Sequence, residues 1–134
     1  EGNLIRSYLA EGKIIPTDIT ISLLQNAINN SPSSVLLIDG FPRTIDQREI
    51  FENEISPCNI ALFLDAPKPI LHKRLVHREK LNYARGTIRS DDNAACREKR
   101  FRVHKEQSVP VIEYYAAQKK LVRIPASGSI QQVY

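Results

Sequence analysis

The feature that most constrains this chain is a short apolar run that ends in a carboxylate, a glycine turn and an arginine. The run is Val35–Ile38, and Asp39–Arg43 follows it directly. A continuous apolar stretch without polar alternation predicts a buried strand of a parallel sheet. Ligands of open α/β sheets bind at the carboxyl ends of strands, so Asp39 and Arg43 are predicted to face a phosphorylated ligand. Gly40 permits the turn that brings the backbone close to that ligand.

Two further apolar runs predict how the rest of the chain folds. Ile60–Leu64, which ends at Asp65, and Leu121–Ile124 are predicted strands. Strands that alternate with helical patterns predict an α/β fold, in which helices flank a parallel sheet. The predicted helices cover residues 4–10 (closed by Gly12), 17–30, 44–55, a stretch after Pro67 and Pro69, 90–115, and a short segment from residue 127.

Local patterns predict where helices begin and where regular structure stops. Thr17 can cap the helix that follows it, and Thr44 with Gln47 forms a capping-box pattern. Pro110 is expected to kink the long helix, because proline removes a hydrogen bond from a helix interior. Residues 76–88 are charged and lack a helical period, which predicts a loop.

Composition narrows the classes of function. The length of 134 residues fits one domain, and the net charge of +4 comes from dispersed basic residues with few aromatics, which argues against a nucleic-acid partner. Cys58 and Cys96 lie far apart, so neither a disulfide framework nor a zinc site is predicted. No run approaches the roughly 20 apolar residues of a membrane span. The expected setting is a reducing, cytoplasmic compartment without membrane contact.

Three arginines could place positive charge around a phosphoryl group in transfer. Arg78, Arg89 and Arg100 flank the charged loop and the helix after it, and phosphoryl transfer depends on such cations. Arg89 and Arg100 are eleven residues apart, about three helical turns, so one face could carry both. Composition alone favours the alternative that they are solvated. Asp91 and Asp92 have an equally plain explanation as helix-cap carboxylates.

Gln47 also has two interpretations that the residues alone leave open. As the third residue after Thr44 it completes the capping box. As an amide one helical turn beyond Arg43 it could bind the edge of a base, because glutamine pairs with adenine through two hydrogen bonds.

Six stretches of the chain match, in order, the motifs of one known family. They are residues 12–16, 39–43, 89–93, 98–101, 109–115 and 126–129. Together they resemble the adenylate kinase family of nucleoside monophosphate kinases, which includes adenylate and uridylate-cytidylate kinases. The resemblance covers nearly all 134 residues. It implies transfer of the γ-phosphoryl group of magnesium-bound ATP to a nucleoside monophosphate, on a P-loop-kinase-type parallel sheet flanked by helices, with a lid loop.

The resemblance also implies roles for residues of an acceptor site. Arg43 would clamp the phosphate of the nucleoside monophosphate, and Gln47 would bind its base, which favours AMP. The implied acceptor-binding residues are Lys13, Ile14, Ile15, Gly40, Phe41, Pro42, Arg43 and Gln47.

The resemblance implies that the residues of the donor-nucleotide site lie on other segments of the chain. Asp39 would orient water bound to Mg²⁺ and would not touch the metal directly. Arg89 and Arg100 would stabilise the transferring group. The remaining implied residues are Arg78 over the triphosphate, Gly128 at the donor adenine, and Asp91 and Asp92, which would tether the arginines when the lid closes.

The chain departs from the family pattern in two places. It has no GxxxxGK[ST] phosphate-binding loop and lacks the first two strands of the family. We therefore expect a fragment that needs the remainder of the polypeptide to fill a slot in its sheet, and that neither folds well nor catalyses alone. In the lid, His77-Arg78-Glu79 replaces the usual arginine-glycine step, so Arg85 is a rival to Arg78. The cysteines of zinc-lid members are missing, so no lid metal is expected.

These patterns together predict a partial nucleoside monophosphate kinase domain over residues 1–134. Residues 1–34 would form acceptor-binding helices, 35–76 and 91–134 the core, and 77–90 the lid. An adenylate kinase is the leading interpretation. The alternatives are a uridylate-cytidylate kinase, and a catalytically inactive kinase-like module that senses nucleotides or has a structural role in a larger assembly.

Overall fold

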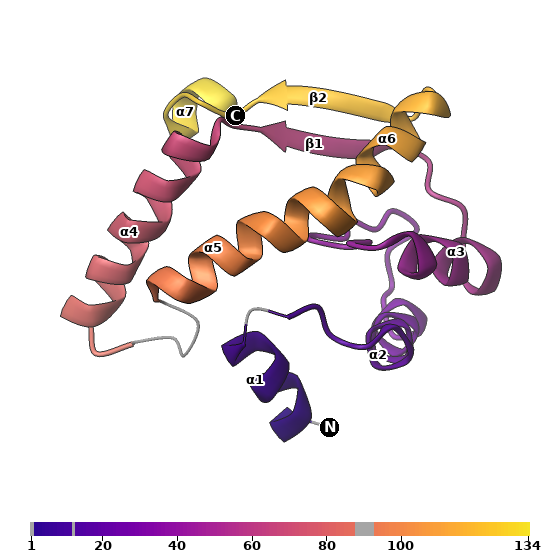
Figure 1. Cartoon of the computed structure of the whole chain (residues 1–134). Coiled ribbons are helices and arrows are strands. Elements are labelled where there is room, and N and C mark those ends of the chain that lie inside the picture. Colours follow the sequence, from indigo (N-terminus) through magenta and orange to yellow (C-terminus); the bar gives the residue numbers. More distant parts are fainter. Residues whose placement is uncertain (1, 12, 88–92) are drawn as a thin grey trace.

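Helices make up most of the described chain, and two of the three predicted strands form. The computed structural model describes residues 2–11, 13–87 and 93–134 (Figure 1). The elements, in order, are α1 (Gly2–Ala10), α2 (Thr17–Asn29), α3 (Ile45–Glu54), β1 (Ala61–Asp65), α4 (Lys68–Ala84), α5 (Ala94–Val103), the π-helical turn η1 (His104–Ser108), α6 (Val109–Ala117), β2 (Leu121–Pro125) and α7 (Ile130–Val133).

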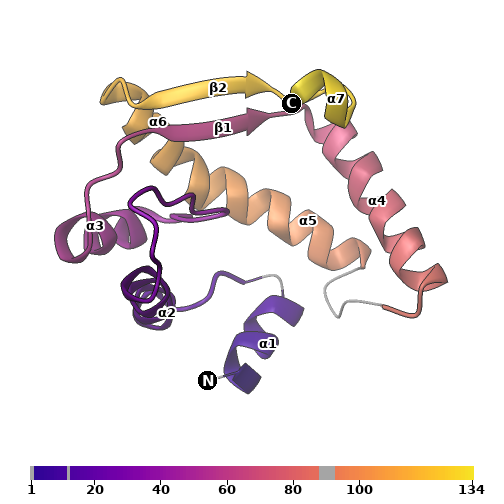
Figure 2. The ribbon, with the colours of Figure 1, turned by 180° about the vertical axis from the view of Figure 1, so that it is seen from behind.

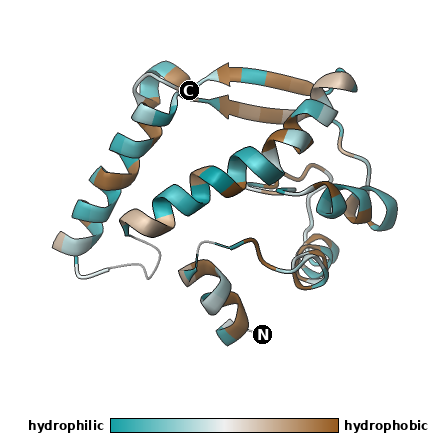
Figure 3. Ribbon diagram, viewed as in Figure 1, coloured by the Kyte–Doolittle hydropathy of each residue, from teal (hydrophilic) through white to brown (hydrophobic). Residues whose placement is uncertain are grey.

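The two strands form a parallel sheet. Ala61 pairs with Leu121 at one end of the register and Asp65 pairs with Pro125 at the other. Both strands are largely apolar (Figure 3). This composition explains why the predicted bounds of both strands agree with the observed bounds to within one residue. A parallel pair needs a long crossover, and α4, α5, η1 and α6 supply it. The predicted α/β class is confirmed.

The helices lie in a definite order around this sheet. The continuous helix of α5, η1 and α6 crosses below β1 and β2, and α1 and α2 lie beyond it on the far side from the strands (Figures 1 and 2). The helix α4 descends from the carboxyl end of β1. No helix in the described part of the chain is long and apolar enough to cross a membrane.

The predicted strand at Val35–Ile38 is not formed, so that prediction is wrong for this structure. Among the described residues, β1 pairs only with β2 and no strand pairs with residues 35–38. A strand is stable only when its N–H and C=O groups find partners. Val35 and Leu37 are 81% and 87% exposed, and Leu62 and Leu64 of β1 are more than half exposed as well. An apolar surface therefore remains open on both segments.

The predicted loop at residues 76–88 is also wrong for most of its length, because α4 continues to Ala84. Arg78, Glu79, Lys80 and Leu81 of this stretch are residue types that favour helices even when most of the helix surface is exposed. The helix is followed by its C-cap Arg85 and then by Gly86, whose φ of +67° suits glycine. The N–H groups of Gly86 and Thr87 close the last turn on carbonyls of Tyr83 and Asn82. The start of the predicted lid, residues 77–84, is therefore helical.

The long helix before β2 is irregular one turn earlier than the predicted kink at Pro110. The N–H of Val109 bonds to the carbonyl of His104, five residues back, within η1. Proline at position 110 has no N–H, and its ring would collide with the carbonyl of Glu106 in a regular helix. The π-helical turn relieves that conflict. The helix begins after Asn93, whose Oδ1 accepts from the Cys96 N–H at 2.8 Å; the predicted cap residues 90–92 lie outside the described residues.

Candidate functional site

The loop from Asp39 to Thr44 curls around the side chain of Arg43. Arg43 Nε donates to the Gly40 carbonyl oxygen at 2.6 Å. Gly40 has φ +70°, and a Cβ at this position would lie 2.9 Å from Arg43 Nη2. Glycine is therefore required here twice, for its backbone conformation and for the close approach of the guanidinium. The Phe41-Pro42 peptide bond in this loop is cis.

Gln47 joins this loop to the segment before α2. Its Oε1 accepts from the Arg43 N–H at 2.9 Å, and its Nε2 donates to the Ile15 carbonyl at 3.4 Å. The residue is 2% exposed, which makes it the buried polar side chain of the described core. Ile15 and Arg43, two predicted acceptor residues 28 positions apart in sequence, are thus joined through one amide.

The capping box predicted at the start of α3 is half formed. Thr44 Oγ1 accepts from the Gln47 N–H at 3.3 Å, as predicted. The Gln47 side chain does not return to the Thr44 N–H, because it is bound to Arg43 and Ile15. Thr44 does act as the N-cap of α3.

Thr17 bonds to α3 and does not cap α2, so that prediction is wrong. The N-cap of α2 is Pro16, with no side-chain cap bond. Thr17 Oγ1 donates to Asp46 Oδ2 at 2.6 Å, and Thr44 Oγ1 donates to Asp46 Oδ1 at 2.6 Å. The bond from Thr17, and then the bond from Thr44, lower the pKa of Asp46. This carboxylate therefore fixes α2 against the start of α3, next to Gln47.

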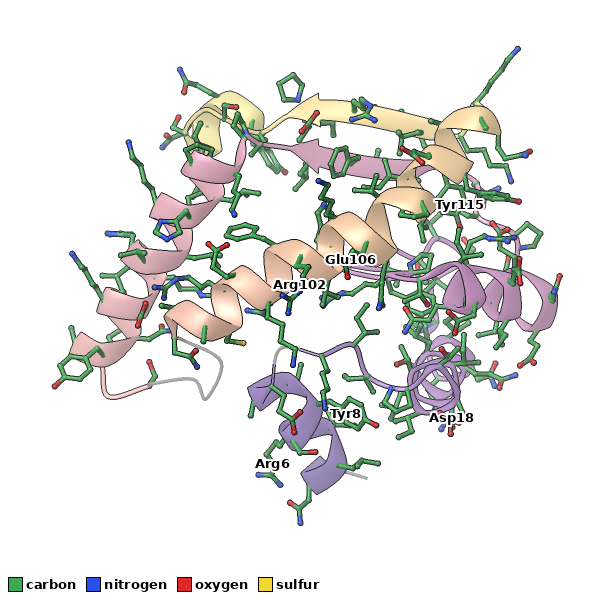
Figure 4. All side chains as sticks on the ribbon, viewed as in Figure 1. Arg6, Tyr8, Asp18, Arg102, Glu106 and Tyr115 are labelled. Atoms are coloured by element: carbon green, nitrogen blue, oxygen red, sulfur yellow. The ribbon has the colours of Figure 1, made fainter. Side chains whose placement is uncertain are left out.

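The π-helical turn η1 lies against the other side of Arg43. Ser108 Oγ donates to the Arg43 carbonyl at 3.0 Å. Burial lowers the pKa of His104, and the Arg43 charge lowers it further. Arg100 precedes His104 by four residues, about one helical turn, so Arg100 comes from the turn of α5 next to this contact. Figure 4 shows the same helix, with Arg102 and Glu106 on it and Tyr115 further along.

Arg78 and Arg100 lie on two helices that are linked to each other. Arg97 of α5 forms an ion pair with Glu79 of α4. Arg78 adjoins Glu79 in sequence, and both Arg78 and Arg100 are half-buried. The rival Arg85 lies at the exposed C-terminal end of α4.

Gly128 lies on the loop between β2 and α7 and is held by α4. Arg74 Nη2 donates to the Gly128 carbonyl at 2.8 Å. The helix α7 follows its N-cap Ser129, which with Gln132 makes a capping box. Arg74 therefore connects the helix that carries Arg78 to the predicted donor residue.

The remaining predicted residues are exposed or lie outside the described part. Lys13 is exposed and forms an ion pair with Glu11 at 2.5 Å. Ile14 is half-buried beside Ile15, and Asp39 is exposed at the end of its loop. Arg89, Asp91 and Asp92 lie outside the described residues.

Three residues that the structure brings to this region have no counterpart among the predictions. They are Ser108, Arg74 and Arg97, each of which bonds to a partner on a distant segment or another helix. Pro110 predicts an irregular helix. It is the local sequence feature that indicates the turn carrying Ser108. Arg74 and Arg97 have no distinguishing signal, because charged residues are ordinary on helix surfaces.

The chain is similar in sequence to several known proteins. The model of the family described as adenylate kinase matches residues 1–120. The chain is 42% identical to "Uridylate kinase" of Saccharomyces cerevisiae, over 99% of this chain and 64% of that protein. It is 42% identical to "UMP-CMP kinase 3" of Arabidopsis thaliana, over 99% of this chain and 63% of that protein. It is 33% identical to "Adenylate kinase 1" of Schistosoma mansoni, over 100% of this chain and 66% of that protein.

Proposed function

The chain belongs to the adenylate kinase family, and from that premise we propose that the whole protein transfers the γ-phosphoryl group of ATP to a nucleoside monophosphate. One observation carries the proposal: Gln47 bonds both to Ile15 and to Arg43. The two segments that would contact an acceptor nucleotide are thereby joined, although they are distant in sequence. The chain spans somewhat less than two thirds of the length of the Saccharomyces cerevisiae relative, so the activity is proposed for the whole protein.

The acceptor phosphate would bind at Arg43. Its guanidinium comes from a loop in which Gly40 leaves the space for it, and a planar fork of donors suits a phosphate. Lys13, Ile14 and Ile15 would offer backbone groups to the acceptor nucleoside. Phe41 and Pro42, from the same loop, would line the acceptor site.

The transferring group would be stabilised by arginines of α4 and α5. Arg78 and Arg100 are on helices that the Arg97–Glu79 ion pair joins, and fixed cations are effective where charge develops on phosphoryl oxygens. Arg89 would act with them, and Asp91 and Asp92 would tether these arginines. Gly128 would approach the donor base through its backbone.

Mg²⁺ would enter with ATP. This ion keeps several of its waters when it binds beside phosphate oxygens, and a nearby carboxylate can accept hydrogen bonds from those waters. Asp39 fits that requirement, because its carboxylate is exposed beside the Arg43 loop. Mg²⁺ supplies charge neutralisation when bound, and Asp39 would hold one of its waters.

We propose that the base of the acceptor nucleotide is a pyrimidine. The alternative acceptor, which Gln47 suggests, is AMP. The relatives named "Uridylate kinase" and "UMP-CMP kinase 3" are each 42% identical to the chain, against 33% for "Adenylate kinase 1". The Gln47 amide is also engaged with two backbone groups and buried. Both observations favour UMP or CMP over AMP.

A coupled assay of ADP production tests the function and the acceptor. The whole protein is incubated with Mg²⁺-ATP and with UMP, CMP or AMP in turn, and kcat/KM is compared. We expect turnover, with UMP or CMP above AMP by at least about tenfold. A preference for AMP would restore the adenylate kinase interpretation. No turnover with any acceptor would favour the inactive nucleotide-sensing or structural module.

A further inference from the structure

Two neighbouring residues of α5 pair with two distant turns of α4. Arg97 forms an ion pair with Glu79. Glu98 Oε2 accepts from Lys68 Nζ at 2.9 Å, and Lys68 is the first residue of α4. Lys68 and Glu79 are eleven residues apart, which is about 16 Å along a helix axis. We call these four residues the α4–α5 brace.

Two attachment points restrain α4 more than one would. A helix held at one point can swing about that point, whereas a second point about 16 Å further along the axis opposes the rotation. The Lys68 end is reinforced, because its ammonium group lies 5.1 Å from the centre of the Phe101 ring, within the range of a cation–π contact. Phe101 follows Glu98 by three residues and so shares its face of α5. The brace therefore fixes the inclination of α4 to α5 (Figure 1).

The two ion pairs of the brace differ in exposure. The side chains of Arg97 and Glu79 are 13% and 35% exposed, whereas those of Lys68 and Glu98 are each 60% exposed. Arg97 Nε is buried without a hydrogen-bond partner among the described residues, so Glu79 neutralises a guanidinium that water reaches poorly. Salt screens an exposed pair and affects a partly buried pair much less. Arg97–Glu79 is therefore the permanent anchor, and Lys68–Glu98 is the salt-sensitive end.

The anchor lies beside arginines of both helices. Arg78 adjoins Glu79 in sequence, and Arg100 follows Arg97 by three residues, about one helical turn. Glu79 also stands where the family pattern has a glycine, so the anchor is a feature of this chain. We propose that the α4–α5 brace fixes the two helices relative to each other before any nucleotide binds, so that the anchor pair positions the arginines of both helices. The inference rests on the proposed function only for its kinetic consequence.

A distance measurement tests the brace without turnover. Spin labels carried by non-canonical amino acids at Tyr83 of α4 and Arg102 of α5, which are both exposed, leave the cysteines untouched. The whole protein without nucleotide should give one narrow distance distribution in double electron–electron resonance. Glu79→Gln should lose that narrow distribution. The matched control is Glu113→Gln, the same change at an exposed carboxylate of α6, which should keep it.

Two further variants keep this measurement decisive if Glu79→Gln is too unstable to study. Glu79→Arg combined with Arg97→Glu exchanges the charges of the anchor and should recover the narrow distribution. Lys68→Ala removes only an exposed contact. At low salt it should broaden the distribution as much as salt of about 1 M, where the Debye length is about 3 Å, does in the unmodified protein. Salt should then broaden the distribution of Lys68→Ala little further.

Steady-state kinetics with Mg²⁺-ATP and UMP or CMP tests the positioning role. Glu79→Gln should lower kcat about tenfold or more with the acceptor KM unchanged, because a misplacement of about 1 Å is enough for such a loss. The charge-exchange variant should recover most of kcat. A purely stabilising role would leave kcat unchanged at temperatures where circular dichroism shows that the variant is folded.

A narrow distribution that survives in Glu79→Gln would overturn the proposal, and so would a charge-exchange variant that recovers neither the distance nor kcat. The failure of the proposed function has a different signature. No turnover with any acceptor, together with a narrow distribution that Glu79→Gln loses and the charge exchange restores, would mean that the function fails while the brace stands. Turnover with a distribution that Glu79→Gln leaves unchanged would mean that the brace fails while the function stands.

Discussion

Tyr115 Oη donates to Glu52 Oε1 at 3.1 Å, and this bond joins α6 to α3. The same Glu52 oxygen accepts from the Cys58 N–H at 3.2 Å. Tyr115 is 3% exposed, and burial, followed by its Cys58 and Glu52 neighbours, raises the pKa of the phenol. The hydroxyl therefore stays protonated and remains a donor. This contact fixes the helix that carries Ser108 against the helix that carries Gln47.

Replacement of Tyr115 by phenylalanine should lower the free energy of unfolding of the whole protein by about 1.5–3 kcal/mol, as the loss of a hydrogen bond to a charged group does. Urea unfolding measures this change. The control is Tyr83→Phe, whose ring is 76% exposed and which should leave the midpoint unchanged. Equal midpoints for both variants would show that the Glu52 contact contributes nothing.

Replacement of Arg43 by alanine should raise the acceptor KM and lower kcat. The combined loss in kcat/KM should be about 2–4 kcal/mol, because a charge-assisted contact of two parallel bonds is lost. Steady-state kinetics with UMP, CMP and AMP measures it. Arg123→Ala is the control, since this exposed arginine of β2 pairs with Asp65. Near-normal kinetics of Arg43→Ala would exclude Arg43 from the acceptor site.

Replacement of Arg100 by alanine should lower kcat by about two to four powers of ten, the range for loss of one transition-state donor or arginine. Dissociation constants of the nucleotides should change far less, which isothermal titration calorimetry checks. Arg102→Ala, on the same helix (Figure 4), serves as control because Arg102 is exposed. Weakened binding with intact turnover at saturation would contradict the assignment.

Replacement of Gly40 by alanine should damage acceptor binding more than stability. Alanine at this position would have to adopt a φ of +70°, and its Cβ would lie 2.9 Å from Arg43 Nη2. The guanidinium must therefore move. We expect an acceptor KM raised about tenfold or more, with the ATP KM unchanged. Gly86→Ala is the informative control. It also places alanine at positive φ but meets no atom within 4 Å, so it should cost about 1 kcal/mol of stability and leave the KM unchanged.

The stability contributed by Asp46 should depend on pH in acid. Its folded pKa is lowered by Thr17 and Thr44, so its contribution is fully present above the unfolded pKa of about 3.9. It is lost as the pH falls through the lower, folded value. Urea midpoints measured from pH 6 to pH 2.5 should therefore fall less steeply for Asp46→Asn than for the unmodified protein. Parallel curves would mean that the two threonine bonds do not stabilise the carboxylate.

Features with local causes were predictable from the sequence. β1 and β2 follow from continuous apolar runs, and the caps at Thr44, Asn93 and Ser129 follow from side chains that bond within three residues. The parallel pairing follows from the long helical connection between the strands. The family resemblance added the acceptor segments, and the family membership is confirmed.

Features that depend on distant partners were not predictable. Residues 35–38 have the composition of a strand, but a strand also needs a hydrogen-bonded neighbour, and none of the described strands pairs with them. The C-terminal part of α4 is charged on most of its surface. Its sequence therefore resembles that of a loop unless the helix propensities of its residues are considered. Ser108 bonds to Arg43 across 65 positions of sequence, so no pattern near either residue shows the contact.

The exposed apolar side chains of Val35, Leu37, Leu62 and Leu64 have a practical consequence for laboratory work with this stretch of chain. An isolated polypeptide of residues 1–134 would expose to its own copies these apolar side chains and the edge of β1 that no described strand pairs with. Such edges recruit one another into aggregates. The yield of soluble protein should therefore drop as the protein is concentrated during purification. Dilute handling, or co-expression with a polypeptide that covers these apolar side chains, should prevent the loss.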